Sequence, residues 1–418
     1  MTETAAALSV ATTPDAPLPV VRVPMLDRHQ QLVAYELLLQ ADEDGDDAPM
    51  HRLLSTLIDG SIAQLTRGNP AFLRLSPGLM LEQADYVLRQ PRIGLVVVPG
   101  DAGDEALLAR LVQLAQRGCA LLFDLGAAPP PGPDTPGAQL LRHARYVRLD
   151  AAGTAPALLA ERCAQLDKRG FKVVAGRVDD RASSHRCIAL PFAAMQGGYL
   201  LLPEKVDVPV LSANRLSVLR LLRALEEENS GPVELGKIIR DDAILSYKLL
   251  GCVNSAYFAL PCRIKSVEQA AIFFGLSRMR NWIATLSLSG MSDRPPELLR
   301  AALIRAQMCE QLAQGMPQPQ REMAFTAGLF SLLDSLMCAP MDFVLQHLPL
   351  APEIRAALLE RGGPFAPLLH QVRLWEAGRM PGDGSIPPQQ ARRVAAAYLK
   401  ATRWADHVFA FAEKRPPG

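Results

Sequence analysis

The strongest constraint on the fold is a change in the pattern of apolar residues near residue 203. Before it, short apolar runs alternate with helical periodicity, as in Ile93–Val98 followed by Glu105–Arg117. This alternation predicts right-handed βαβ crossovers and a parallel sheet, open or closed into a barrel. From Ser212 onward nearly every segment has helical periodicity. The pattern therefore predicts an α/β half followed by an all-helical half.

The individual elements follow from the same periodicity. The expected strands are Val20–Pro24, Ala71–Leu75, Ile93–Val98, Ala120–Phe123, Tyr146–Leu149, Lys172–Ala175 and Ala193–Gly197. The helices expected after Ser212 include Ala243–Val253, Val267–Phe274, Glu322–Leu336, Ala366–Glu376 and Pro388–Phe411. A chain of 418 residues exceeds what one ordinary core supports. We expect a barrel domain at 18–205, a helical domain at 206–418 and a disordered Ala-, Thr- and Pro-rich tail at 1–17.

The composition excludes several classes of protein. The formal net charge is +1, and Lys and Arg are scattered along the chain, so no basic surface for nucleic acid is expected. The seven cysteines form no CxxC pair, which disfavours a zinc site and favours a reducing compartment. No apolar run approaches the roughly 20 residues of a membrane span, and no secretory signal is present. We expect a cytoplasmic protein.

The segment Tyr35-Glu36-Leu37 follows the first strand and a tight turn. With the order of the later motifs, it resembles the EAL family of cyclic-di-GMP phosphodiesterases, over residues 18–205. The resemblance implies a TIM-like barrel, in standard or modified form. In that family, carboxylates and an amide at strand ends hold two divalent metals that activate water against a phosphodiester. Oxygen ligands at the rim of a barrel suit that chemistry.

The site positions of the family fall at Glu36, Arg74, Asp124, Arg148, Asp150 and Gln196 in this sequence. Several of them carry a residue type that differs from the family's. Arg74 stands where the family has a metal-binding Asn, Arg148 where it has Lys, and Leu95–Val98 lacks the family's Glu. An arginine and a divalent cation at one rim would repel each other. The resemblance therefore implies a degenerate phosphodiesterase site, with no catalytic residue, no metal and no cofactor.

Two uses of the remaining side chains are open. Arg74, Arg148 and Arg177 are candidates for contacts with the phosphates of a nucleotide that is bound but not hydrolysed. In the alternative, which we favour, Glu36 and Asp124 make only local hydrogen bonds or ion pairs.

The segment Ile238–Gly275 reads as helix, polar break, helix. Asp241 or Asp242 can cap the helix that follows, and Asn254-Ser255 interrupts the apolar pattern. The segment resembles the HDOD domain, a relative of the HD phosphohydrolases, and the resemblance covers about residues 206–405. Its signature positions here are Asp242, Asn254, Ser255 and Gly275. Asn254-Ser255 either caps the next helix and satisfies backbone groups, the interpretation we favour, or contacts a ligand.

The metal pair of the phosphohydrolases has no counterpart in this half. Where they have His-Asp, this chain has Ser331-Leu332, and only Asp334 follows as an isolated carboxylate. We therefore expect a non-catalytic bacterial regulatory protein that acts through contacts with other signalling proteins, in a pathway such as motility, stress or cyclic-di-GMP signalling. The alternative is a non-hydrolysing cyclic-di-GMP receptor at the barrel rim. An active phosphodiesterase ranks last.

Overall fold

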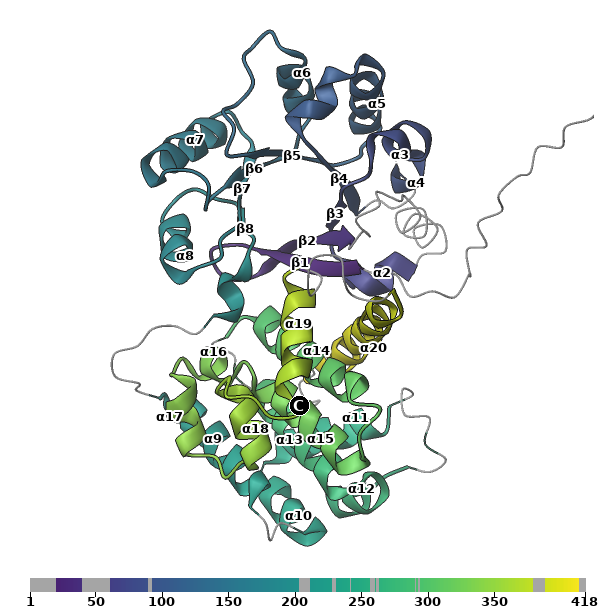
Figure 1. The fold of residues 1–418 in the computed structure, drawn as a ribbon, viewed down its shortest axis with the longest axis vertical. Helices are drawn as coiled ribbons and strands as arrows, with labels where there is room; N and C mark the ends of the chain where they lie inside the picture. The colour runs from purple at the N-terminus through teal and green to yellow at the C-terminus, as the bar shows by residue number, and fades with distance from the viewer. Residues whose placement is uncertain are drawn as a thin grey trace, which may run out of the picture.

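The computed structural model describes residues 20–39, 61–88, 92–202, 211–227, 231–240, 242–255, 260, 263–289, 291, 294–378 and 388–412. Within these residues the chain forms a β-barrel wrapped by helices and an all-helical half beneath it (Figure 1). The predicted order, α/β followed by all-α, is confirmed. The predicted tail at 1–17 and the predicted junction at residue 205 lie outside the described residues.

The described strands close the barrel in chain order. They are β1 (Val20–Leu26), β2 (Leu32–Leu39), β3 (Ala71–Leu73), β4 (Ile93–Val97), β5 (Leu121–Gly126), β6 (Tyr146–Asp150), β7 (Lys172–Gly176) and β8 (Ala194–Met195). From β2 to β8 each strand is parallel to the next, whereas β1 is antiparallel to both β2 and β8. The prediction of a parallel sheet is therefore wrong at β1. The turn between β1 and β2 is too short for the crossover that parallel pairing requires.

Helices cover the outside of the barrel (Figure 1). They are α2 (Ser61–Thr66), α3 (Pro77–Glu82), α4 (Asp85–Leu88), α5 (Glu105–Gln116), α6 (Pro136–Arg142), α7 (Pro156–Lys168) and α8 (Arg181–Ile188), with the 3₁₀ helices η1 (Pro99–Gly103) and η2 (Gly198–Leu201). Local capping sets where they begin. Asp104, for example, accepts the backbone N–H groups of Ala106 and Leu107 at the start of α5.

The barrel interior is built by the period of two along each strand. One buried side chain from each strand contributes to a single cluster inside the barrel: Met25, Ala34, Phe72, Val96, Leu122, Tyr146, Val174 and Ala194. Two residues further along, the same parity brings Glu36, Asp124, Arg148 and Gln196 to the interior, in a layer nearer the carboxyl ends of the strands than this cluster. This is the end of a TIM-like barrel where sites are normally built.

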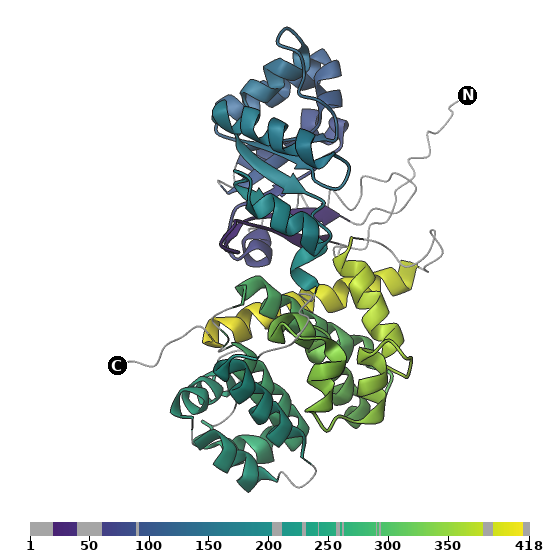
Figure 2. The same cartoon turned by 90° about the vertical axis from the view of Figure 1, so that its left-hand side faces the viewer.

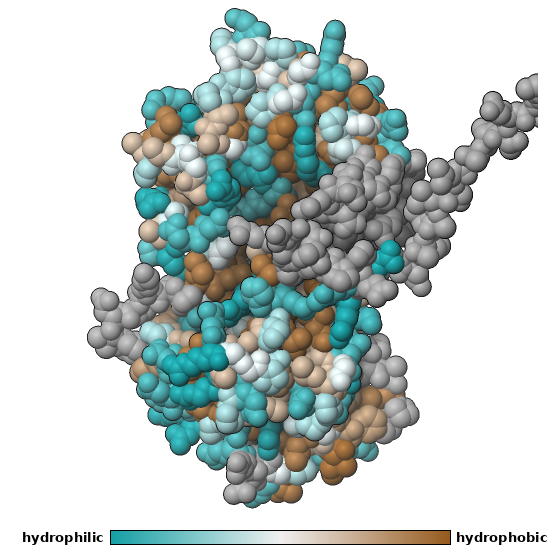
Figure 3. Space-filling model, in the orientation of Figure 1, coloured by the Kyte–Doolittle hydropathy of each residue, from teal (hydrophilic) through white to brown (hydrophobic). Residues whose placement is uncertain are grey.

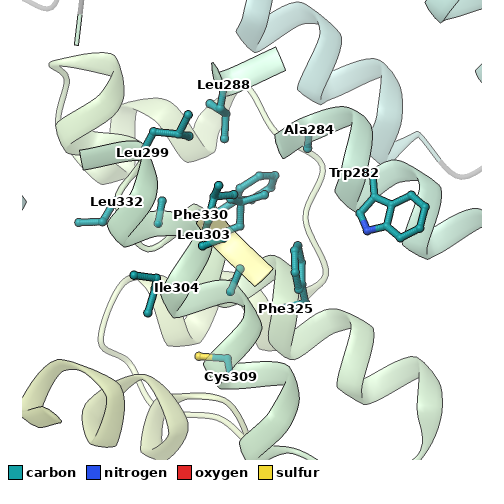
Figure 4. Close-up of a cluster of buried hydrophobic side chains, with 14 of the residues drawn as sticks. Trp282, Ala284, Leu288, Leu299, Leu303, Ile304, Cys309, Phe325, Phe330 and Leu332 are labelled. Atoms are coloured by element: carbon teal, nitrogen blue, oxygen red, sulfur yellow. The ribbon is translucent and has the colours of Figure 1, made fainter. Parts of the chain in front are cut away.

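The helical half comprises α9 (Ala213–Glu226), α10 (Pro232–Arg240), α11 (Ala243–Val253), α12 (Val267–Phe274), α13 (Leu276–Ser289), α14 (Pro296–Leu312), α15 (Gln318–Phe330), α16 (Leu333–Met337), α17 (Met341–Gln346), α18 (Pro352–Leu358), α19 (Ala366–Glu376) and α20 (Pro388–Ala412). In its core, buried side chains of α13, α14 and α15 pack together (Figure 4). Gly328 allows α15 to approach α14 closely, because a Cβ there would lie 2.6 Å from the Cα of Ala306.

One predicted helix is interrupted. The periodicity of Glu322–Leu336 predicts a continuous helix, but the structure ends α15 at Phe330 and starts α16 at Leu333. The backbone N–H and the hydroxyl of Ser331 both donate to the carbonyl of Gly328, so the helical hydrogen-bond pattern stops there.

Buried ion pairs join the two halves. The Arg22 guanidinium of β1 donates two hydrogen bonds to Asp406 of α20, at 2.8 and 3.0 Å. Arg300 of α14 binds the same carboxylate at 2.7 Å and also binds Glu297. Glu297 in turn accepts from the Tyr35 hydroxyl of β2 at 3.0 Å. Because α20 runs along the junction (Figure 2), this network fixes the helical half against β1 and β2.

Candidate functional site

Arg148 lies at the centre of the polar layer at the barrel mouth. Its guanidinium donates to Asp124 at 2.6 Å, to the amide oxygen of Gln196 at 2.9 Å and to Glu36. The Gln196 amide also donates to Glu36. Four side chains from β2, β5, β6 and the end of β8, far apart in the sequence, therefore satisfy one another.

The network is largely shielded from water. The Arg148 side chain is 15% exposed and that of Glu36 is 5% exposed. Burial lowers the pKa of the Arg148 guanidinium, but the charges of Glu36 and Asp124 outweigh this effect and leave the pKa above its ordinary value. Arg148 is therefore a fixed cation between two carboxylates.

This arrangement does not fit a pair of divalent metal ions. Glu36 and Asp124 both pair with the Arg148 guanidinium, so their negative charge is already balanced by a side-chain cation, which would repel a metal ion. Among the described residues, no group of three or more His, Cys, Asp or Glu side chains could hold a metal ion.

The other candidate arginines lie elsewhere. Arg74 does not line the mouth network, because it pairs with Asp101 of η1, with Nη2 and Oδ1 2.7 Å apart, and donates to the Val96 carbonyl. Arg177 follows β7 and donates to Asp150 at 2.7 Å. The structure thus separates Arg74 from Arg148 and brings Arg177 to the rim instead.

Arg177 adopts an unusual backbone conformation. Its φ of 55° lies in the left-handed region, where a side chain is disfavoured by about 1–2 kcal/mol relative to glycine. The side chain is 66% exposed, while Asp150 is 10% exposed and also accepts the N–H groups of Ala152 and Gly153. The two backbone N–H groups bind Oδ1 of Asp150, whereas Arg177 binds its Oδ2.

A cavity of about 650 Å³ lies above the mouth network, between the barrel and the helical half. The surface is hollowed there (Figure 3). On the barrel side its lining includes Glu36, Arg148 and Arg177; on the helical side it includes Arg305 and Arg373. The sequence pattern did not single out these helical residues, because no motif marks them. The packing of α19 against β1 and of α14 against η2 brings them to the barrel.

Comparisons with known proteins agree with this architecture. The family model of the HDOD domain matches residues 213–341. YuxH of Bacillus subtilis is 26% identical over 93% of this chain and 98% of its own length. The cyclic di-GMP phosphodiesterase CdgJ of Vibrio cholerae is 26% identical over 85% of this chain and 84% of its own. The chain joins an EAL-like barrel to an HDOD domain. The FimX EAL domain of Xanthomonas citri, solved with c-diGMP, covers 43% of this chain and 85% of its own, with 16% identity and a TM-score of 0.34.

The signature residues of the HDOD domain have structural roles in this protein. Asp242 accepts the Leu245 N–H and caps α11, which decides between the two candidate caps. Gly275 ends α12 with a φ of 90°, a conformation that favours glycine. Ser255 lies 2.9 Å from the His407 ring, between Oγ and Nε2.

The described part of the chain contains no helix with the length and apolar character needed to cross a membrane.

Asn254 joins two segments of the HDOD domain. Its amide donates to the carbonyls of Leu250 and Ile264, both at 2.8 Å, and its carbonyl accepts the Ile264 N–H at 2.7 Å. The next helix, α12, is capped by Ser266 instead. The expectation that Asn254-Ser255 caps that helix is therefore wrong, while the satisfaction of backbone groups by Asn254 agrees with the structure.

We expect Asn254→Ala to destabilise the HDOD domain by about 2–3 kcal/mol, because both backbone groups of the buried Ile264 lose their partner. Urea unfolding followed by Trp fluorescence measures this. The neighbouring variant Ser255→Ala loses one hydrogen bond and should cost about 1 kcal/mol. Equal effects of the two variants would contradict the bridging role of Asn254.

The phosphohydrolase positions of the HDOD domain are also filled without a metal set. Ser331 accepts a hydrogen bond from Arg305 at 3.2 Å, and Leu332 is buried in the core. Asp334 lies in the first turn of α16 and accepts the Ser335 N–H at 2.7 Å. Burial raises the pKa of Asp334 above its ordinary 3.8.

This pKa shift predicts a pH dependence of stability. The folded protein holds the Asp334 proton more tightly than the unfolded chain, so the contribution of Asp334 to stability falls as the pH rises above 3.8. Asp334→Asn removes the titration, and its stability relative to wild type should rise between about pH 4 and about pH 7. Urea unfolding at the two pH values checks this. A constant difference would show that Asp334 does not titrate as described.

Proposed function

We propose that this chain is a non-catalytic regulatory protein of bacterial signalling, in which the EAL-like barrel and the HDOD domain act together as a platform for other signalling proteins. One observation carries the proposal: the Arg148 guanidinium lies between Glu36 and Asp124. These carboxylates stabilise a side-chain cation and are not free to hold the two metals that hydrolysis of a phosphodiester would use. CdgJ is a phosphodiesterase by name, so loss of this activity would distinguish the present chain from that relative.

The test is product analysis. The full chain is incubated with cyclic di-GMP and Mg²⁺ or Mn²⁺, and the linear dinucleotide is measured by chromatography. We expect wild type to form no more product than Glu36→Ala. Turnover by wild type that is lost in Glu36→Ala would overturn the proposal.

A second candidate function is a non-hydrolysing receptor for cyclic di-GMP. The cavity at the barrel mouth supports it, because 650 Å³ lies within the range of small-molecule sites and Arg177 is available at its rim. Calorimetric titration with cyclic di-GMP in the absence of divalent metal tests this. Binding is the expected result, and no binding would remove the receptor function while leaving the regulatory one.

A further inference from the structure

The cavity at the barrel mouth is built by two domains. Barrel residues, among them residues of β1, β2, β5, β6 and β7, line one side, and α14, α19 and α20 of the helical half line the other. The buried contacts of Arg22 and Tyr35 with Asp406 and Glu297 hold these parts together. The cavity therefore exists before any ligand enters.

Most charges around the cavity are engaged by buried partners. Arg148 binds Glu36 and Asp124, and Arg305 binds Glu376 at 2.8 Å. These pairs neutralise one another and are largely buried. They make the wall of the cavity polar but leave no unpaired positive charge for a ligand.

Two arginines, one from each domain, are more exposed than Arg148 and Arg305 and are held less firmly by carboxylates. Arg177 of the barrel is mostly exposed, and it donates to Oδ2 of Asp150 from Nη1, while its Nε and Nη2 have no partner among the described residues. Arg373 of α19 is 36% exposed and pairs with Glu360, which is itself 72% exposed, so solvent weakens this pair. Arg373 can turn to a ligand oxyanion at small cost, and Arg177 can bind one through Nε and Nη2 while Nη1 stays on Asp150.

The left-handed backbone conformation of Arg177 also indicates a role in ligand binding. An arginine is held at a position that glycine would occupy without strain, and it pairs there with the buried Asp150 at the edge of the cavity. Strain of this kind is tolerated at ligand sites more often than elsewhere.

The chemistry of the lining defines the ligand. Guanidinium groups bind phosphate oxygens in a bidentate manner. Apolar side chains of both domains, among them Val23, Leu38 and Ile304, line the same cavity and offer a surface for a planar base.

We propose that Arg177 of the barrel and Arg373 of the HDOD domain together bind the phosphates of one nucleotide in this cavity. The ligand then contacts both domains at once, so its binding is coupled to their relative position. This inference rests on the receptor function proposed above and adds the HDOD domain to the site.

The test is calorimetric titration of the full chain with cyclic di-GMP. Arg177→Gly and Arg373→Ala should each weaken binding at least tenfold. Arg361→Ala, which removes an exposed arginine of the HDOD domain outside the cavity, should bind within twofold of wild type. Thermal unfolding controls for folding. Arg177→Gly relieves the left-handed strain but removes the partner of Asp150 Oδ2, so a single cooperative transition, and not an unchanged Tm, shows that the variant is folded.

The outcomes separate the proposals. If Arg177→Gly weakens binding and Arg373→Ala does not, the two-domain site is wrong and a receptor site confined to the barrel remains. If Arg361→Ala weakens binding as much as the other two, attraction is non-specific and the inference is wrong. If wild type does not bind cyclic di-GMP, both the inference and the receptor function are wrong, whereas the non-catalytic proposal depends on product analysis alone.

Discussion

Asp406→Ala is expected to lower the free energy of unfolding by about 3–5 kcal/mol, the usual cost of removing one partner from a buried ion pair. Asp406 is the shared acceptor of Arg22 and Arg300, whose side chains are only 3% and 2% exposed. Without it, two buried guanidinium groups face each other across the junction of the domains. We therefore expect the barrel and the HDOD domain to unfold separately in this variant.

The chain offers a direct readout of this separation. Its three tryptophans, Trp282, Trp375 and Trp404, all lie in the helical half, so Trp fluorescence follows that half while far-UV circular dichroism follows both halves. The two urea transitions should coincide in wild type and separate in Asp406→Ala.

Asp85→Ala is the matched control. Asp85 also pairs with two arginines, Arg110 and Arg117, but it is 50% exposed on the barrel surface. Its loss should cost about 0–1 kcal/mol and leave the transitions coincident. Equal losses in Asp85→Ala and Asp406→Ala would contradict the role of the buried network.

Arg148→Ala is the second variant with a large expected effect. It leaves Glu36 and Asp124 without their cation in a layer that is mostly shielded from water. We expect a loss of about 3–5 kcal/mol at neutral pH, measured by urea unfolding.

Arg148→Lys separates charge from shape. Lysine restores a positive charge but has no planar fork to bind two carboxylates at once. It should recover part of the stability lost in Arg148→Ala. Full stability in Arg148→Ala would show that the ion pairs contribute little.

The sequence predicts the fold best where the determinants are local. α11 and α12 match their predicted bounds residue for residue, because Asp242 and Ser266 cap them from within the same segment. β2 lies outside the predicted strands. Its sequence, Leu32–Leu39, is apolar at most positions and lacks clear alternation, since one face packs under helices and the other lines the barrel.

The candidate site is predicted only in part. Family positions identify Glu36, Asp124 and Arg148, but their mutual contact depends on the closure of the barrel, which brings residues 112 and 24 positions apart together. Arg74 is a candidate for a nucleotide contact in the sequence, but in the structure it binds Asp101. The sequence does not predict this pair, because Asp101 lies in η1 and belongs to no motif. Arg373 reaches the cavity through packing between domains, which periodicity does not encode.

A Mn²⁺ titration followed by thermal unfolding tests whether the Arg148 guanidinium excludes metal from the barrel mouth. A metal that binds only the folded state raises its Tm. We expect no Mn²⁺-dependent rise in wild type, and a rise in Arg148→Ala, where Glu36, Asp124 and Gln196 are released. A rise in wild type that disappears in Glu36→Ala and in Asp124→Ala would contradict it.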